Sequence, residues 1–226
     1  MKKVLCSVAA ALSSLTSAFA QEVESDFQSW NAIAISGPVK EDSRLLLWFD
    51  GHARFNNNAS DLGVTIIRPA LGWRVNNSLD VWAGYARVVS RDDGRPDIEE
   101  DRFWQQATYA LPSVFGGSLS GRSRLEQRFR GTGETGWRYR QFVRWAKPIG
   151  NSDFSAVVWD ELFLNFNDAE GVQRSGFDQN RFFVGAAWHI KDNVRLEGGY
   201  LNNVLDTPIA KEQINHNVSL TLFWNL

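Results

Sequence analysis

The sequence predicts an all-β protein: a transmembrane, antiparallel, up-and-down β-barrel of about 12 strands, with about 10 also possible. Segment 118–130, SLSGRSRLEQRFR, gives the first indication, because arginine, glutamate and serine alternate there with leucine, glycine, phenylalanine and neutral polar residues. Successive side chains of a strand point to opposite faces of a sheet, so one face of this strand is almost wholly charged. The second indication is an export signal. The third is that no later apolar run approaches the about 18 residues of a membrane helix.

Residues 1–20 are expected to be a cleaved signal peptide. Lys2 and Lys3 supply a positive start, and the apolar stretch 4–15 is shorter than the about 20 residues that a membrane helix needs. Residues 18–20, Ala-Phe-Ala, fit the small-x-small cleavage pattern, so we expect a single outer-membrane β-barrel domain over residues 21–226. The expected location is the outer membrane of a Gram-negative cell. The single cysteine, Cys6, lies in the signal, so we expect no disulfide.

The strands are expected where apolar and polar residues alternate between turn sequences rich in Gly, Asn, Asp and Pro. Eleven segments fit, in chain order 27–36, 43–55, 63–75, 78–90, 100–111, 118–130, 137–147, 153–166, 178–190, 193–204 and 213–226. Bacterial single-chain barrels normally have an even number of strands. We therefore expect either a strand missing from this count, giving about twelve, or a segment outside the wall, giving about ten.

The turns sort into two groups when the strands are counted back from the C-terminus. Alternation assigns 76–77, 111–118, 147–153 and 190–193 to the periplasmic side. It assigns the longer and more polar connections 91–99, 167–177 and 204–213 to the cell surface.

The last segment, 215–226 (NHNVSLTLFWNL), alternates apolar and polar residues down to its end. This pattern resembles the terminal signal that the barrel-assembly machinery reads in outer-membrane barrels, although Leu226 stands where phenylalanine is usual. The expected partners are therefore outer-membrane lipids and, during insertion, the barrel-assembly machinery. The alternative is an amphipathic strand of a soluble sandwich, against which stand further one-sided apolar stripes at 182–190 and 194–200.

The charged strand faces are expected to line the lumen. The candidate network consists of Arg102, Arg122, Arg124, Glu126, Arg128, Arg138, Arg140, Glu161, Arg181 and Glu197. Arginine exceeds acid on these faces, so water, anions or carboxylate bridges must compensate the guanidinium groups. Within the network, we expect Glu126 to bridge Arg124, Arg128, Arg138 and Arg140.

Two functions stay open for such a lumen. It is either a charged plug that stiffens a passive envelope component, or a narrow, anion-leaning channel for a small anionic or polar solute. The tryptophans follow the same alternation. We expect Trp73, Trp137, Trp145, Trp188 and Trp224 outside and Trp48, Trp82, Trp104 and Trp159 inside.

No catalytic constellation is recognisable in the sequence, so we do not expect an enzyme. The histidines His52, His189 and His216 show no metal spacing and no GxSxG motif occurs, so we expect neither a metal nor another cofactor. The net charge of −2 argues against nucleic acid as a partner. The remaining alternatives are an outer-membrane lipid-modifying enzyme and a structural or adhesion scaffold that acts through its outer loops.

Six blocks in order resemble a known family. They are RFWQQ at 102–106, RLEQR at 124–128, WRYR at 137–140, DELFLN at 160–165, FDQNR at 177–181 and GYLN at 199–202. Together they resemble the proteobacterial outer-membrane β-barrel family catalogued as domain of unknown function 2490, over nearly the whole mature chain. The resemblance implies an outer-membrane barrel and brings no activity with it.

Overall fold

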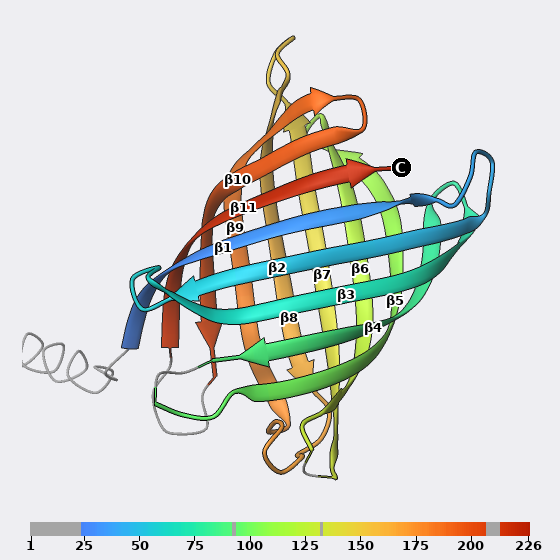
Figure 1. The fold of residues 1–226 in the computed structure, drawn as a ribbon. Helices are drawn as coiled ribbons and strands as arrows, with labels where there is room; N and C mark the ends of the chain where they lie inside the picture. Colours follow the sequence, from blue (N-terminus) through green and yellow to red (C-terminus); the bar gives the residue numbers. More distant parts are fainter. Residues whose placement is uncertain (1–23, 92–93, 132, 207–212) are drawn as a thin grey trace, which may run out of the picture.

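Long strands form where the sequence alternates, and in the computed structural model eleven of them close into one barrel (Figure 1). The structure describes residues 24–91, 94–131, 133–206 and 213–226; the expected signal peptide lies outside them. The strands are β1 Glu24–Pro38, β2 Leu45–Asn56, β3 Asp61–Asn76, β4 Leu79–Ser90, β5 Ile98–Val114, β6 Gly117–Phe129, β7 Thr135–Pro148, β8 Phe154–Asn165, β9 Gly176–Lys191, β10 Val194–Leu205 and β11 Gln213–Asn225. Among these residues, no helix is long and apolar enough to cross a membrane.

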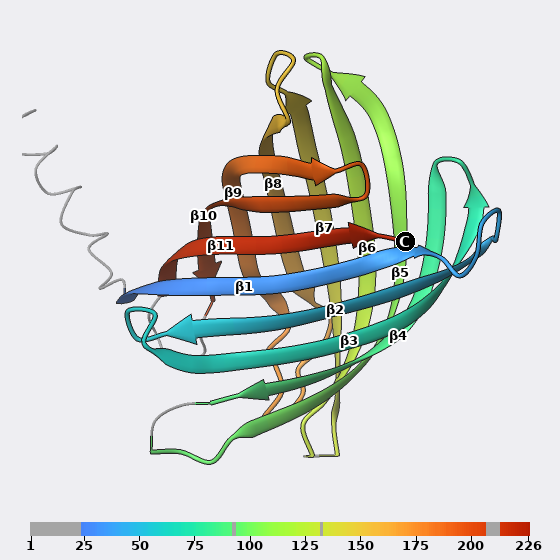
Figure 2. The ribbon, with the colours of Figure 1, turned by 45° about the horizontal axis from the view of Figure 1, so that its top comes forward.

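The strands follow one another around the barrel in chain order, each antiparallel to the next. The barrel closes differently: β1 and β11 pair in parallel, from Glu24 opposite Gln213 to Ser36 opposite Asn225. Figure 2 shows the two strands side by side. The all-β, up-and-down barrel is confirmed, and the closing pair corrects the expectation that every pair is antiparallel. An even count is required only when every pair is antiparallel, so the eleven described strands close without a twelfth.

The connections between strands gather at two rims. The first, which we call the C-terminal rim, holds the end of β11 and the connections after β1, β3, β5, β7 and β9. The second, the loop rim, holds the start of β1 and the connections after β2, β4, β6, β8 and β10. This division matches the two groups of turns expected from the sequence. Since the strand number is odd, the start of β1 and the end of β11 lie at opposite rims.

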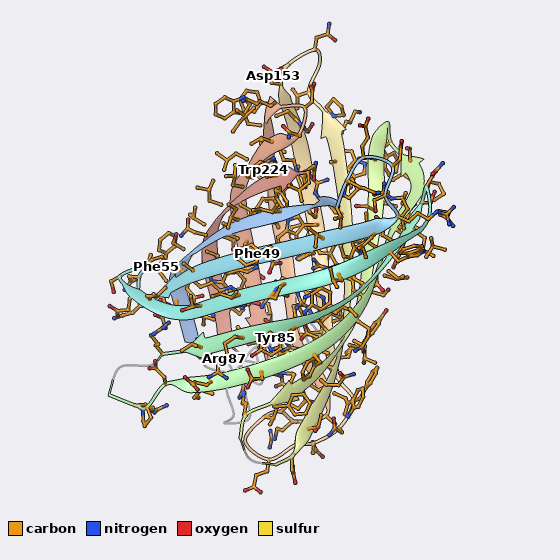
Figure 3. All side chains as sticks on the ribbon, turned by 45° about the vertical axis from the view of Figure 1, so that its right-hand side comes forward. Phe49, Phe55, Tyr85, Arg87, Asp153 and Trp224 are labelled. Carbon is orange, nitrogen blue, oxygen red and sulfur yellow. The ribbon has the colours of Figure 1, made fainter. Side chains whose placement is uncertain are left out.

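The polarity of the barrel is inverted relative to a soluble protein. Among the described residues, thirty-two large hydrophobic side chains are exposed, whereas sixteen hydrophobic residues are buried. Phe49 and Trp224 are examples of the exposed set and can be located in Figure 3. Arginine and glutamate side chains dominate the buried polar set. Isolated soluble proteins seldom expose so much apolar surface, so this exterior differs from theirs.

Tryptophan rings fill part of the interior, as the alternation predicts. Trp82 and Trp104 are buried, Trp48 packs edge-on against Trp82 with ring centroids 5.4 Å apart, and Trp159 stacks on Phe183 at 5.1 Å. Trp73, Trp137, Trp188 and Trp224 are exposed as expected, whereas Trp145 is half-buried and donates its indole N–H to the carbonyl of Val114.

Glycine makes room for the inward rings. A Cβ atom at Gly84 would lie 2.4 Å from the ring of Trp104, and one at Gly72 would lie 2.3 Å from the ring of Trp82. Both distances are far below contact, so these strand positions require glycine. The two glycines therefore let the large rings lie flat against the inside of the wall.

Candidate functional site

Strand alternation and register bring the charged residues together inside the barrel. On β6, Arg122, Arg124, Glu126 and Arg128 all point inward. The register places Glu126 opposite Arg138 on β7, since antiparallel partners face each other across the ladder. Each of the ten predicted site residues is buried or half-buried, and the acids among them are 6% exposed or less.

Glu126 lies at the centre of the network. Its Oε2 accepts hydrogen bonds from Arg138 Nε at 3.1 Å and Nη2 at 2.6 Å, and its Oε1 accepts one from Arg140 Nη1 at 2.7 Å. Arg124 Nη1 lies 3.6 Å from Oε1, and Arg102 Nη1 lies 4.0 Å from Oε2. One carboxylate with an exposed fraction of 1% thus joins arginines from three strands.

A second carboxylate, Glu100 on β5, corrects the predicted pairing of Arg128. Arg128 forms a bidentate pair with Glu100, with Nε to Oε1 at 2.8 Å and Nη2 to Oε2 at 3.0 Å, rather than a pair with Glu126. Arg102 and Arg130 also bind Glu100. Glu100 was not among the predicted site residues, although the strand predicted over 100–111 contains it and alternation places it on the same face as Arg102. Its spacing of two from Arg102 was the available signal.

Glu161 on β8 extends the network further around the wall. Its Oε1 accepts hydrogen bonds from Arg140 Nε at 3.1 Å, Arg140 Nη2 at 2.6 Å and Arg122 Nη2 at 2.7 Å. Arg181 Nη1 lies 3.7 Å from Oε2. Because Arg140 also binds Glu126, nine of the ten predicted residues form one connected set. Glu197 lies apart and pairs with Arg144 at 2.7 Å.

The β8–β9 connection covers the network at the loop rim. Ala169 and Val172 are buried, Arg128 Nη1 donates to Gln173 Oε1 at 3.4 Å, and Arg130 Nη1 donates to the carbonyl of Gly171 at 3.3 Å. We call Glu100, Glu126 and the arginines that bind them the ion-pair plug. The covering connection ties this plug to the loop rim of the barrel.

The same connection holds its own shape by a turn. The carboxylate of Asp168 accepts hydrogen bonds from the backbone N–H of Ser175 at 2.7 Å and from its hydroxyl at 3.1 Å. These bonds favour the charged carboxylate, so they lower the pKa of Asp168 below its usual value.

A cavity of about 710 Å³ occupies the other part of the lumen. It reaches the C-terminal rim at Asn77 and Ser78, and its inner part is lined by Glu161 and the arginines around it, Arg122, Arg140 and Arg181. Glu100 and Glu126 do not line it, so this lumen cavity and the centre of the ion-pair plug occupy different parts of the described lumen. Arg140 joins the two parts, because it binds Glu126 and also lines the cavity.

The lumen cavity has an excess of positive charge. Within the described chain, its lining holds the arginines Arg54, Arg68, Arg74, Arg122, Arg140, Arg144, Arg181 and Arg195 against the carboxylates Asp50, Asp80, Glu161 and Glu197. Every one of these carboxylates already binds an arginine. Alternation on β2 and the register of β2 with β3 were the signals for Arg54 and for the Asp50–Arg68 pair, which the sequence analysis missed.

Two of the cavity arginines form no ion pair with any carboxylate that the structure describes: Arg54 and Arg195. Arg54 instead holds its guanidinium 3.9 Å from the ring centre of Trp30, and Arg195 holds its own 4.0 Å from that of Phe223. The Nε atoms of both are buried and lack a hydrogen-bond partner. The positive charges of Arg54 and Arg195 are therefore the ones in the cavity that no described carboxylate pairs with.

The histidines take part in polar contacts without forming a recognisable catalytic group. His52 Nε2 lies 3.0 Å from Arg68 Nη2 and 3.7 Å from Asp50. His189 Nε2 lies 3.1 Å from the hydroxyl of Ser155, on the inner face near the C-terminal rim. Among the described residues no carboxylate completes this pair into a triad, and no group of acids, histidines or cysteines fits a metal ion.

Comparison with known proteins identifies relatives of unknown function. A family model described as "Protein of unknown function (DUF2490)" matches residues 27–215. An uncharacterized protein of Methylorubrum extorquens is 35% identical over 203 residues, which cover 88% of this chain and 87% of that protein. The match includes β2–β10 and all ten predicted network residues.

Proposed function

The chain belongs to the DUF2490 family of proteins of unknown function, and from this premise we propose that it is an outer-membrane β-barrel whose lumen is closed by its own ion pairs. In this proposal the protein is a passive envelope component rather than an open pore. The observation that carries it is the ion-pair plug, in which Glu100 and Glu126 are 2% and 1% exposed.

The inverted polarity supports the location. Apolar side chains cover the outside of the wall, and a lipid bilayer is the environment that hides such a surface without further partners. The proposed surroundings are therefore outer-membrane lipids. The expected signal peptide at residues 1–20 supplies the route, and the barrel-assembly machinery is the proposed partner during insertion.

The geometry of the plug supports the closed lumen. Guanidinium and carboxylate groups bound at 2.6–3.1 Å leave no room for a hydrated ion between them. Parting a buried pair leaves an uncompensated charge and costs several kcal/mol, so thermal opening is rare. The second candidate is a narrow, anion-leaning channel, and the arginine excess of the lumen cavity favours it.

Neither remaining alternative gains support from the contacts. A lipid-modifying enzyme needs its nucleophile where lipid can reach it, whereas Ser155 is buried and meets the exposed His189 on the inner face of the wall. A scaffold acting through outer loops could not use the β8–β9 connection as a free loop, because this connection lies against the plug.

Planar-bilayer recording of the refolded chain lacking residues 1–20 tests the proposal. We expect no stepwise conductance from the wild type or from Glu99→Gln, which changes an exposed neighbour outside the lumen. We expect anion-preferring steps from Glu100→Gln/Glu126→Gln, because the remaining arginines repel one another. Regular steps from the wild type would contradict the closed lumen and favour the channel.

A further inference from the structure

Two arginines flank one tryptophan at the inner part of the lumen cavity. Arg54 lies 3.9 Å and Arg181 4.8 Å from the ring centre of Trp30, measured from each guanidinium carbon. Both line the cavity, and the Nε atom of each is buried without a hydrogen-bond partner. Two like charges therefore share a single indole ring.

The carboxylate of Glu161, near Arg181, already binds other arginines. Glu161 lies 3.7 Å from Arg181, but its Oε1 accepts the stronger hydrogen bonds of Arg140 and Arg122. Arg54 has no ion pair with a carboxylate of the described chain. One negative charge thus serves a group of arginines, and a cation–π contact offsets only part of the cost of an uncompensated guanidinium. An added anion beside Arg54 and Arg181 removes this imbalance.

The walls next to the two arginines are aromatic. Trp159 stacks on Phe183 at 5.1 Å and packs against Phe142 at 5.4 Å, and all three rings line the cavity. A site with a few convergent polar groups on an aromatic wall, in a cavity of about 710 Å³, has the size and the chemistry of a small-molecule site.

We propose that the lumen cavity is a binding site for small organic anions that carry a carboxylate or phosphate group on a flat apolar body. The anionic group binds Arg54 and Arg181, and the apolar body lies along the rings of Trp30 and Trp159. Entry is from the C-terminal rim, past Arg195. This site does not depend on the closed barrel proposed above, because the same arginines line the cavity whether or not the barrel conducts ions. Silence in a bilayer and absence of binding are therefore separate outcomes.

Fluorine NMR titration of the refolded chain in dodecyl maltoside micelles tests the site. The probes are 4-(trifluoromethyl)benzoate, 4-(trifluoromethyl)phenyl phosphate and the neutral 4-(trifluoromethyl)benzamide, with empty micelles as the blank. We expect both anions to bind at least tenfold more tightly than the amide, and the stronger of the two identifies the preferred anionic group. Equal affinity for anions and amide would overturn the proposal.

Matched variants assign the binding to Arg54. Arg54→Gln is expected to weaken anion binding on the order of tenfold, because a charge-assisted hydrogen bond is lost. Arg54→Lys should keep the preference for anions over the amide. Arg87→Gln, on the outside of the wall and bound to Asp101, should bind as the wild type does. Unchanged affinity in Arg54→Gln would overturn the assignment.

Thermal stability distinguishes an arginine that waits for an anionic ligand from one that has only a structural role. Without a probe, Arg54→Gln is expected to melt at a higher temperature than the wild type, since it removes an uncompensated charge. Anionic probes should raise the melting temperature of the wild type more than that of the variant. A variant that melts lower, or fails to fold, would show that Arg54 is already compensated within the fold and would contradict the proposal.

Discussion

At the scale of single residues, the interior of this barrel depends on carboxylates that each serve several arginines. Glu126 binds Arg138 and Arg140 directly and lies within 4.0 Å of two further guanidinium groups. Replacing a buried ion pair as a unit is often harmless, but removing one member leaves charges without compensation. The acids are therefore the sensitive positions, because they are fewer than the arginines around them.

Glu126→Gln is predicted to lower the free energy of unfolding by about 3–5 kcal/mol, since it leaves Arg138 and Arg140 without their shared charge. Urea unfolding in micelles, followed by tryptophan fluorescence, measures the change. Glu99→Gln is the matched control, because its pair with Arg87 is exposed and contributes at most about 1 kcal/mol. If the two variants unfold at the same urea concentration, Glu126 does not hold the plug together.

Sequence reasoning reached most members of the network, with Glu100 as the exception, but not all of its pairs. Alternation alone places Arg124, Glu126 and Arg138 on inward faces, because it depends only on the period of a strand. The pairing of Arg128 with Glu100 depends on the register between β5 and β6, which places Arg102 opposite Arg128 and Glu100 two residues away on β5. This register is set by packing across the sheet, which leaves no local signal in the sequence.

At the scale of elements, the strands were predictable and their closure was not. All eleven predicted segments overlap the observed strands and keep their order. The parallel seam joins β1 and β11, which lie at the two ends of the described chain, so no turn between them fixes the partner or its direction. The expectation of an even strand number assumed that all neighbouring strands are antiparallel, so it excluded the parallel pair of β1 and β11.

Deletion of residues 223–226 is predicted to abolish membrane insertion. These residues complete the pairing of β11 with β1, and the N–H of Leu226 donates to the carbonyl of Ser36 at 2.9 Å. The deletion also removes Trp224 and Leu226 from the terminal apolar stripe. Extraction of outer membranes from cells expressing the truncated chain measures the effect. Recovery at the wild-type level in that fraction would show that this end does not act as the closing strand.

At the scale of the whole molecule, an odd strand number places the two ends of the wall at opposite rims. If the C-terminal rim faces the periplasm, the start of β1 and the β8–β9 connection face the cell exterior, and the lumen cavity opens inward. An anion-binding cavity would then sample the periplasm and not the surroundings of the cell. The orientation therefore decides which solutes reach Arg54 and Arg181.

Cysteine labelling of intact cells is predicted to distinguish the rims. The chain's only cysteine lies at position 6 in the expected signal, so Glu170→Cys on the β8–β9 connection and Asp153→Cys on the β7–β8 connection each report one site (Figure 3 labels Asp153). A membrane-impermeant maleimide should label Glu170→Cys in whole cells and Asp153→Cys only after the outer membrane is opened. The reverse pattern would contradict the orientation.

The central claim is that the charged face of every strand is the inside and that the apolar face needs lipid. Sedimentation velocity of the chain lacking residues 1–20, refolded with and without dodecyl maltoside, tests this claim most directly. We predict a folded monomer in micelles and aggregated, unfolded chain in buffer alone, because the exposed apolar wall has no other partner. A folded monomer that is stable without detergent would contradict the account.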